Sequence, residues 1–238
     1  MTKEDIQVIN KEATSRGNKQ YAKMVLIFLL TVVMSSLASW ATRFVPNYSW
    51  LPFVRLIGAY LIVVFVVGPI NAGFSKAALQ LGFSDNIDGC VMDFMRGEKY
   101  IKAVQVYALY YAVTYFPLLI SSLGDMFNVG ILRMVALPFI LISMYFFIFE
   151  FTLIDVILAD RPDIGTINAF KLSMKMMKGN KGHYFSLIFS FTVWIIVSIV
   201  TCLVGLIFFV PYLRCANACF YEKIRDELGY INPDEIEL

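Results

Sequence analysis

The chain has 238 residues, of which 59% are hydrophobic and 16% aromatic, and its mean hydropathy is +0.69. This apolar content lies well above the usage of soluble globular domains. The net charge is only +2, and the basic residues are not clustered as a nucleic-acid-binding face requires. The composition therefore indicates a membrane protein and argues against a nucleic-acid partner.

The chain divides into a polar start, a long apolar middle and a short polar end. Residues 1–23 carry both charges and lack the apolar core of a signal peptide, so we expect them to lie in the cytosol. Uncharged runs follow, and a run of about 18 or more residues can cross the roughly 30 Å hydrocarbon core as a helix. The short alternating segments of a membrane barrel are missing. The predicted fold class is all-α, a polytopic membrane bundle over residues 24–222, followed by a cytosolic tail at 223–238.

Six spans are predicted, at residues 24–42, 56–80, 103–124, 134–158, 184–203 and 205–222. The fourth has sixteen uncharged residues before Glu150, so a helix that ends near residue 158 carries Glu150 inside the membrane. The apolar stretch at 184–213 fits one steeply tilted helix, which gives five spans, or two helices that turn near Gly205, which gives six.

The distribution of basic residues favours six spans. Seventeen basic residues then lie on the side of the N terminus, and only Arg43, Arg55 and Arg133 lie on the other side, whereas five spans give fourteen and six. Because cytosolic loops are enriched in Lys and Arg, both termini are predicted to face the cytosol. The outer loops are short, so any soluble partner is expected to bind from the cytosolic side.

The loop between the fourth and fifth spans is predicted to form an amphipathic helix. Apolar residues recur there at three- and four-residue steps, as do three lysines on another face: Ile167, Phe170, Met174 and Met177, then Lys171, Lys175 and Lys178. Such a helix can lie on the inner leaflet with its lysines on anionic lipid. Alternatively, it packs under the bundle with the lysines in solvent.

A second short interfacial helix is predicted between the second and third spans. Asp85 is suited to cap it, and Val91, Phe94 and Met95 would form its apolar side.

Two ionisable residues, Glu150 and Arg214, are placed deep in predicted spans, where burying either alone costs roughly 2.5–3.5 kcal/mol. Each lies eight residues from the cytosolic end of its span, so the two share a depth and a salt bridge between them is feasible. Asn71 has nearly the same depth. We therefore predict an intramembrane polar layer of Asn71, Glu150 and Arg214, which either fixes helix packing or forms a path for a substrate or a proton.

Motifs of catalytic and metal-binding sites are missing from the sequence. His183 is its one histidine, and neither a P-loop, an HExxH nor a GxSxG pattern occurs. We expect no catalytic, cofactor or metal site and no enzyme activity. The four cysteines have no CxxC spacing and are expected to be free thiols: Cys90, Cys202, Cys215 and Cys219.

Three segments carry a family resemblance: GPINAGF at residues 68–74, ILADRPDIGTINAFKLSMKMMKGNKGHYF at 157–185 and VPYLRCANACFYEKIRDEL at 210–228. Over about residues 56–228 the chain resembles a bacterial integral membrane family, domain of unknown function 975. The resemblance implies a multi-spanning protein of the bacterial cytoplasmic membrane. It brings no established activity, cofactor or catalytic residue.

These observations favour a non-enzymatic membrane protein that is a partner or regulator of other membrane components or that interacts with lipid. The alternative is a small transporter or lipid-moving protein that uses the layer of Asn71, Glu150 and Arg214 as its site. The expected partners are the lipid bilayer, anionic inner-leaflet lipids and other membrane proteins.

Overall fold

The computed structural model describes residues 3–41, 51–201 and 204–229, and every regular element within these ranges is a helix, as predicted. The elements in chain order are α1 (Lys3–Lys19), α2 (Tyr21–Ala41), α3 (Leu51–Ile62), the π-helix η2 (Val63–Val67), α4 (Gly68–Gln80), α5 (Cys90–Asp93), α6 (Gly97–Met126), α7 (Gly130–Tyr145), the π-helix η3 (Phe146–Glu150), α8 (Ile154–Asp160), α9 (Thr166–Met177), α10 (Lys181–Ser190), α11 (Thr192–Val200) and α12 (Val204–Leu228).

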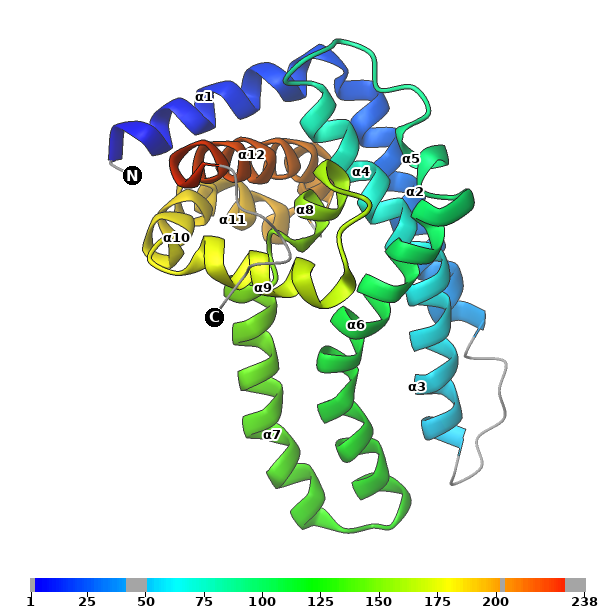
Figure 1. The fold of residues 1–238 in the computed structure, drawn as a ribbon. Helices are drawn as coiled ribbons and strands as arrows, with labels where there is room; N and C mark the ends of the chain where they lie inside the picture. The colour runs from blue at the N-terminus through cyan, green and yellow to red at the C-terminus, as the bar shows by residue number, and fades with distance from the viewer. Residues whose placement is uncertain (1–2, 42–50, 202–203, 230–238) are drawn as a thin grey trace.

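The helices form two regions (Figure 1). Helices α6 and α7 make a long antiparallel hairpin whose closed end points away from the rest, and α3 runs beside α6. The remaining helices gather at the open end of this hairpin, where α12 lies across its direction and α1 packs on α12. The main apolar core lies in this second region, around α4, α8 and α12.

Four helices are long and apolar enough to cross a membrane: Leu56–Gln80, Gly97–Gly124, Gly130–Glu150 and Val204–Leu228. They correspond to the second, third, fourth and sixth predicted spans. The first predicted span corresponds to α2, which forms with α1 a helix pair bent by 88°, and the fifth corresponds to the pair of α10 and α11, bent by 47°. Counting each pair as one span raises the total to six. The chain is thus a multi-pass helical membrane protein with four to six candidate spans.

The fourth span differs from its prediction because it is not one helix to residue 158. Helix α7 widens into η3, and the chain then turns at Phe151 and Thr152 before α8 begins at Ile154. The backbone N–H of Phe151 still donates to the carbonyl of Phe146, five residues earlier, so the π-type ladder ends at this turn. The break re-aims α8 toward α4 and α12, and it thereby sets the direction of the polar residues described below.

Residues 1–23 contain an amphipathic helix that the sequence was not predicted to form. Ile6, Ile9 and Ala13 of α1 are buried, and their three- and four-residue spacing places them on one face against α12. The predicted helix capped by Asp85 is wrong. Asp85 instead forms an ion pair with Lys19, and only the single turn α5 lies in that segment.

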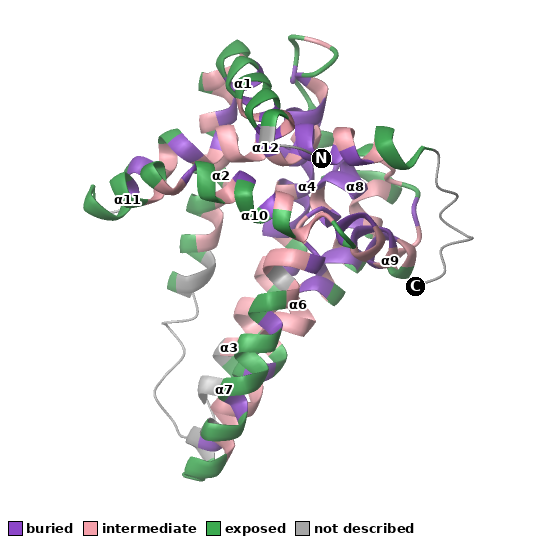
Figure 2. Ribbon diagram, turned by 90° about the vertical axis from the view of Figure 1, so that its left-hand side faces the viewer, coloured by how far each residue is buried: buried purple, intermediate pink, exposed green. Residues whose placement is uncertain are grey.

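Figure 2 contrasts the two regions by burial. Helices α4 and α8 are mostly buried, whereas α7 and α11 expose apolar side chains along much of their length. A contiguous exposed apolar face of this kind is unfavourable in water and normal in lipid. The burial pattern therefore agrees with a bilayer as the solvent of the α6–α7 hairpin.

Candidate functional site

Arg214 of α12 is the centre of a polar cluster between four helices. Its Nη1 lies 2.6 Å from the carboxylate of Asp155 on α8 and donates at 3.3 Å to the hydroxyl of Ser75 on α4. Its Nη2 donates at 3.0 Å to the amide oxygen of Asn71, also on α4. The guanidinium also lies 5.3 Å from the ring centroid of Phe74. The predicted grouping of Asn71 with Arg214 is thus present in the structure.

Asp155 uses both of its carboxylate oxygens. One accepts from Arg214, and the other accepts from the hydroxyl of Tyr107 on α6 at 2.7 Å. Asp155 was not among the residues predicted for the layer. It lies three residues before the end of the predicted fourth span, and in an unbroken helix it would point about 140° away from Glu150. The sequence did show that Asp155 is a charged residue inside a predicted span. It did not show the turn before α8 that directs Asp155 to Arg214, because no glycine or proline marks that turn.

Glu150 does not pair with Arg214, and this part of the predicted layer is corrected. Its carboxylate accepts from Lys181 at the start of α10, and the hydroxyl of Tyr145 lies 3.5 Å away. Lys181 also donates to the Tyr145 hydroxyl at 2.8 Å. The η3 turn and the break after it separate Glu150 from α12, so the two predicted partners belong to two different ion pairs.

The Arg214 cluster is well suited to hold helices together. Breaking a buried ion pair leaves an uncompensated charge, whereas a pair with its remaining donors and acceptors satisfied can be tolerated in a low-dielectric interior. Here the charged pair adds bonds to Asn71, Ser75 and Tyr107. Residues from α4, α6, α8 and α12 therefore meet in one network.

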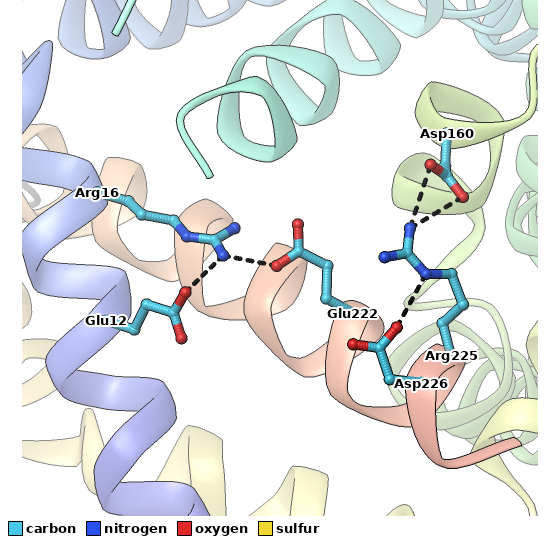
Figure 3. A network of polar contacts seen from close by, with 6 residues as sticks. All are labelled: Glu12, Arg16, Asp160, Glu222, Arg225 and Asp226. Atoms are coloured by element: carbon cyan, nitrogen blue, oxygen red, sulfur yellow. Dashed lines mark hydrogen bonds and ion pairs between the residues drawn. The ribbon is translucent and has the colours of Figure 1, made fainter. Parts of the chain in front are cut away.

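A second ionic cluster joins α1 to α12 (Figure 3). Arg16 reaches from α1 toward α12, and its Nη2 lies 2.6 Å from both Glu12 and Glu222. Farther along α12, Arg225 lies between Asp160 of α8 and Asp226. The C-terminal part of α1 is thus anchored to the same helix that carries Arg214.

Helix α9 packs against the bundle through one face. Its buried residues are Ala169, Phe170, Leu172, Ser173, Met176 and Met177. The predicted apolar stripe is therefore only partly right, because Phe170 and Met177 are buried whereas Ile167 is 66% exposed. The opposite face carries Lys171, Lys175 and Lys178, of which Lys178 is the most exposed. This arrangement resembles the packed alternative more than a helix lying with its apolar face on lipid.

The cysteines that the structure describes are free and buried: Cys90, Cys215 and Cys219. This agrees with the prediction for these three, and Cys202 lies outside the described residues. Burial raises the pKa of the Cys90 thiol, which lowers the thiolate fraction at neutral pH. Its thiol also contacts the side-chain oxygen of Gln80 at 2.8 Å.

We therefore expect a maleimide at pH 7 to leave these three cysteines unlabelled in the folded protein and to label them after denaturation in SDS. Site-resolved mass spectrometry of the labelled chain measures this. A Lys11→Cys variant, at an exposed position of α1, provides the reactive control. Labelling of Cys90 as fast as of that control would contradict the packing around α5.

Within the described ranges, no group of three or more His, Cys, Asp or Glu side chains is arranged to hold a metal ion.

The long apolar helices and the ion pair set among them define a multi-pass α-helical membrane protein. Residues 1–227 match the family described as protein of unknown function DUF975, so the chain belongs to that family, and the match reaches farther toward the N terminus than the sequence motifs suggested. No curated protein and no solved structure matches the chain.

Proposed function

We propose that the chain is a non-enzymatic protein of the bacterial cytoplasmic membrane that binds anionic lipid of the inner leaflet through α9. In this proposal both termini and the α9 lysines face the cytosol, as the distribution of basic residues suggests.

The observation that carries the proposal is the contrast between the α9 lysines and five lysines of other helices. Those five have carboxylate partners: Lys19 with Asp85, Lys23 with Asp88, Lys76 with Asp93, Lys181 with Glu150 and Lys223 with Asp5. Among the residues that the structure describes, Lys171, Lys175 and Lys178 have no such partner. An array of free cations beside membrane-spanning helices is suited to lipid phosphate.

The three lysines of α9 determine how strongly the protein is expected to bind anionic lipid and how this binding depends on salt. Each lysine near an anionic surface contributes about 1 kcal/mol, and the contribution falls off within a Debye length. Since the apolar face of α9 is already buried in the bundle, lipid binding does not have to order the helix backbone, and only the lysine side chains lose freedom.

The transport alternative is less well supported by the geometry of the polar layer. Asp155 and Arg214 satisfy each other and also bond Tyr107, Asn71 and Ser75, which suits a packing role better than a site that binds and releases a substrate. The separate pairing of Glu150 with Lys181 removes one member from the layer.

The test uses the full chain in nanodiscs that contain equal amounts of phosphatidylglycerol and phosphatidylcholine. The lipids that stay bound after mild detergent extraction are counted by mass spectrometry. We expect enrichment of phosphatidylglycerol in the parent, and a loss of that enrichment by about tenfold or more in the variant Lys171→Gln/Lys175→Gln/Lys178→Gln.

The matched control is Lys19→Gln/Lys23→Gln/Lys223→Gln, which removes the same charge from α1, α2 and α12. It should keep the enrichment, because these three lysines already have carboxylate partners. Equal enrichment in the parent and in the α9 variant would overturn the proposal.

A further inference from the structure

An apolar crevice of about 370 Å³ runs between α6 and α7. Its lining comes from both helices: Ala112, Val113, Phe116 and Pro117 on α6, then Phe139, Ile142 and Ser143 on α7 and Phe146 at the start of η3. Ser143 turns its one polar group away, because its hydroxyl donates to the carbonyl of Val113. The crevice therefore offers only apolar surface to an occupant and suits a hydrocarbon chain.

The end of the crevice nearest the bundle leads to α9. Val113 and Phe146 line that end, and both pack against the same apolar cluster as Met174 of α9. Helix α9 also contacts both α6 and η3. On α9, Met174 lies three residues after Lys171 and four before Lys178, so it borders the lysine face. The lysine face thus begins where the apolar crevice ends.

We propose that the crevice and the α9 lysines together form a binding site for one anionic glycerophospholipid, with an acyl chain between α6 and α7 and the phosphate at Lys171, Lys175 and Lys178. This inference rests on the proposed function and adds to it a defined position and a single occupant. The argument for this occupant is charge complementarity, since three cations without carboxylate partners among the described residues adjoin a purely apolar channel.

The two parts of the site have different roles. A lipid chain in the bilayer is already in apolar surroundings, so its transfer into the crevice gains little free energy, and the crevice mainly positions the lipid. The preference for an anionic headgroup then comes from the lysines. A zwitterionic lipid can enter the crevice, but it is not retained by the charge of α9.

The proposal can be tested with brominated lipids, which quench a nearby tryptophan. The reporter is Phe139→Trp in the full chain with Trp40, Trp50 and Trp194 replaced by Phe. Phe139 lines the crevice and is 44% exposed, so an aromatic replacement fits there. The control reporter is Leu137→Trp in the same background, because Leu137 lies at a similar depth on another side of α7 and is 60% exposed.

At equal mole fraction, we expect bromo-acyl phosphatidylglycerol to occupy the Phe139→Trp site on the order of tenfold more strongly than bromo-acyl phosphatidylcholine. The control reporter should show no preference. Adding Lys171→Gln/Lys175→Gln/Lys178→Gln should abolish the preference at Phe139→Trp, and an unchanged unfolding temperature shows that the fold is kept.

The outcomes separate this inference from the proposed function. If the α9 variant loses phosphatidylglycerol enrichment in nanodiscs but Phe139→Trp shows no preference, α9 binds anionic lipid elsewhere and the crevice is not the site. Equal preference at both reporters indicates a general ring of anionic lipid and also overturns the site. If the α9 variant keeps both the phosphatidylglycerol enrichment in nanodiscs and the preference at Phe139→Trp, both proposals are overturned.

Discussion

Replacing Asp155 with alanine is expected to lower the free energy of unfolding by about 3–5 kcal/mol, because Arg214 then remains among the helices without its counter-charge. The side chains of Arg214 and Asp155 are only 21% and 15% exposed, so solvent can compensate little of this loss. Tyr107 also loses its acceptor. Thermal or SDS unfolding of the purified protein, followed by circular dichroism, measures the change.

The double variant Asp155→Leu/Arg214→Met is the matched control for this prediction. It removes both charges and fills the volume with apolar side chains, and replacing a whole buried pair in this way is often neutral or stabilising. We therefore expect the double variant to recover most of the stability that Asp155→Ala loses. A single variant as stable as the parent would contradict the view that the Arg214 cluster holds the four helices together.

Hydropathy predicted the long helices because the length of a span and its lack of charge are local properties. Leu56–Gln80 agrees with its predicted range of 56–80 to the residue, and the third span agrees over its apolar part. The interruption of the fourth span was not predictable in the same way. Phe151 and Thr152 carry no glycine or proline signal, and the turn there depends on how α8 packs against α4.

The polar layer shows the same limit at the level of single side chains. Counting residues placed Asn71 and Arg214 at one depth, and the structure bonds them directly. Depth alone does not give rotation about a helix axis, however, and rotation decides which carboxylate faces Arg214. Glu150 and Asp155 were both inside the predicted fourth span, and the turn between them assigned Asp155 to Arg214 and Glu150 to Lys181.

The sequence of α1 contains an amphipathic pattern that was overlooked because the segment is rich in charged residues. Ile6, Ile9 and Ala13 recur at three- and four-residue steps, the pattern of an amphipathic helix with one buried face. The many charges around them led to the expectation of a plain cytosolic segment. In the structure these charges support the packing, because Arg16 follows on the same face and reaches the carboxylate of Glu222 on α12.

Arg16→Ala is expected to release α1 from α12 and to lower the free energy of unfolding by about 3 kcal/mol. Arg16 is only 7% exposed, and Glu222, which it contacts at 2.6 Å, would be left nearly buried without a cation. Its guanidinium also packs on Gly82 in the turn after α4, where a Cβ added to the glycine would lie 2.7 Å from Nη1. One side chain thus joins three separate segments of the chain.

Hydrogen exchange of the α1 amides is the direct measurement, because a helix that detaches locally loses its protection without global unfolding. The matched control is Lys19→Ala on the same helix, which removes an exposed ion pair with Asp85 and should change stability by less than about 1 kcal/mol. If the α1 amides of Arg16→Ala stay as protected as those of the control, the apolar contacts of Ile6, Ile9 and Ala13 are sufficient to hold α1. In that case the ion pairs of Arg16 contribute little to the contact between α1 and α12, and α1 is held by its buried apolar face.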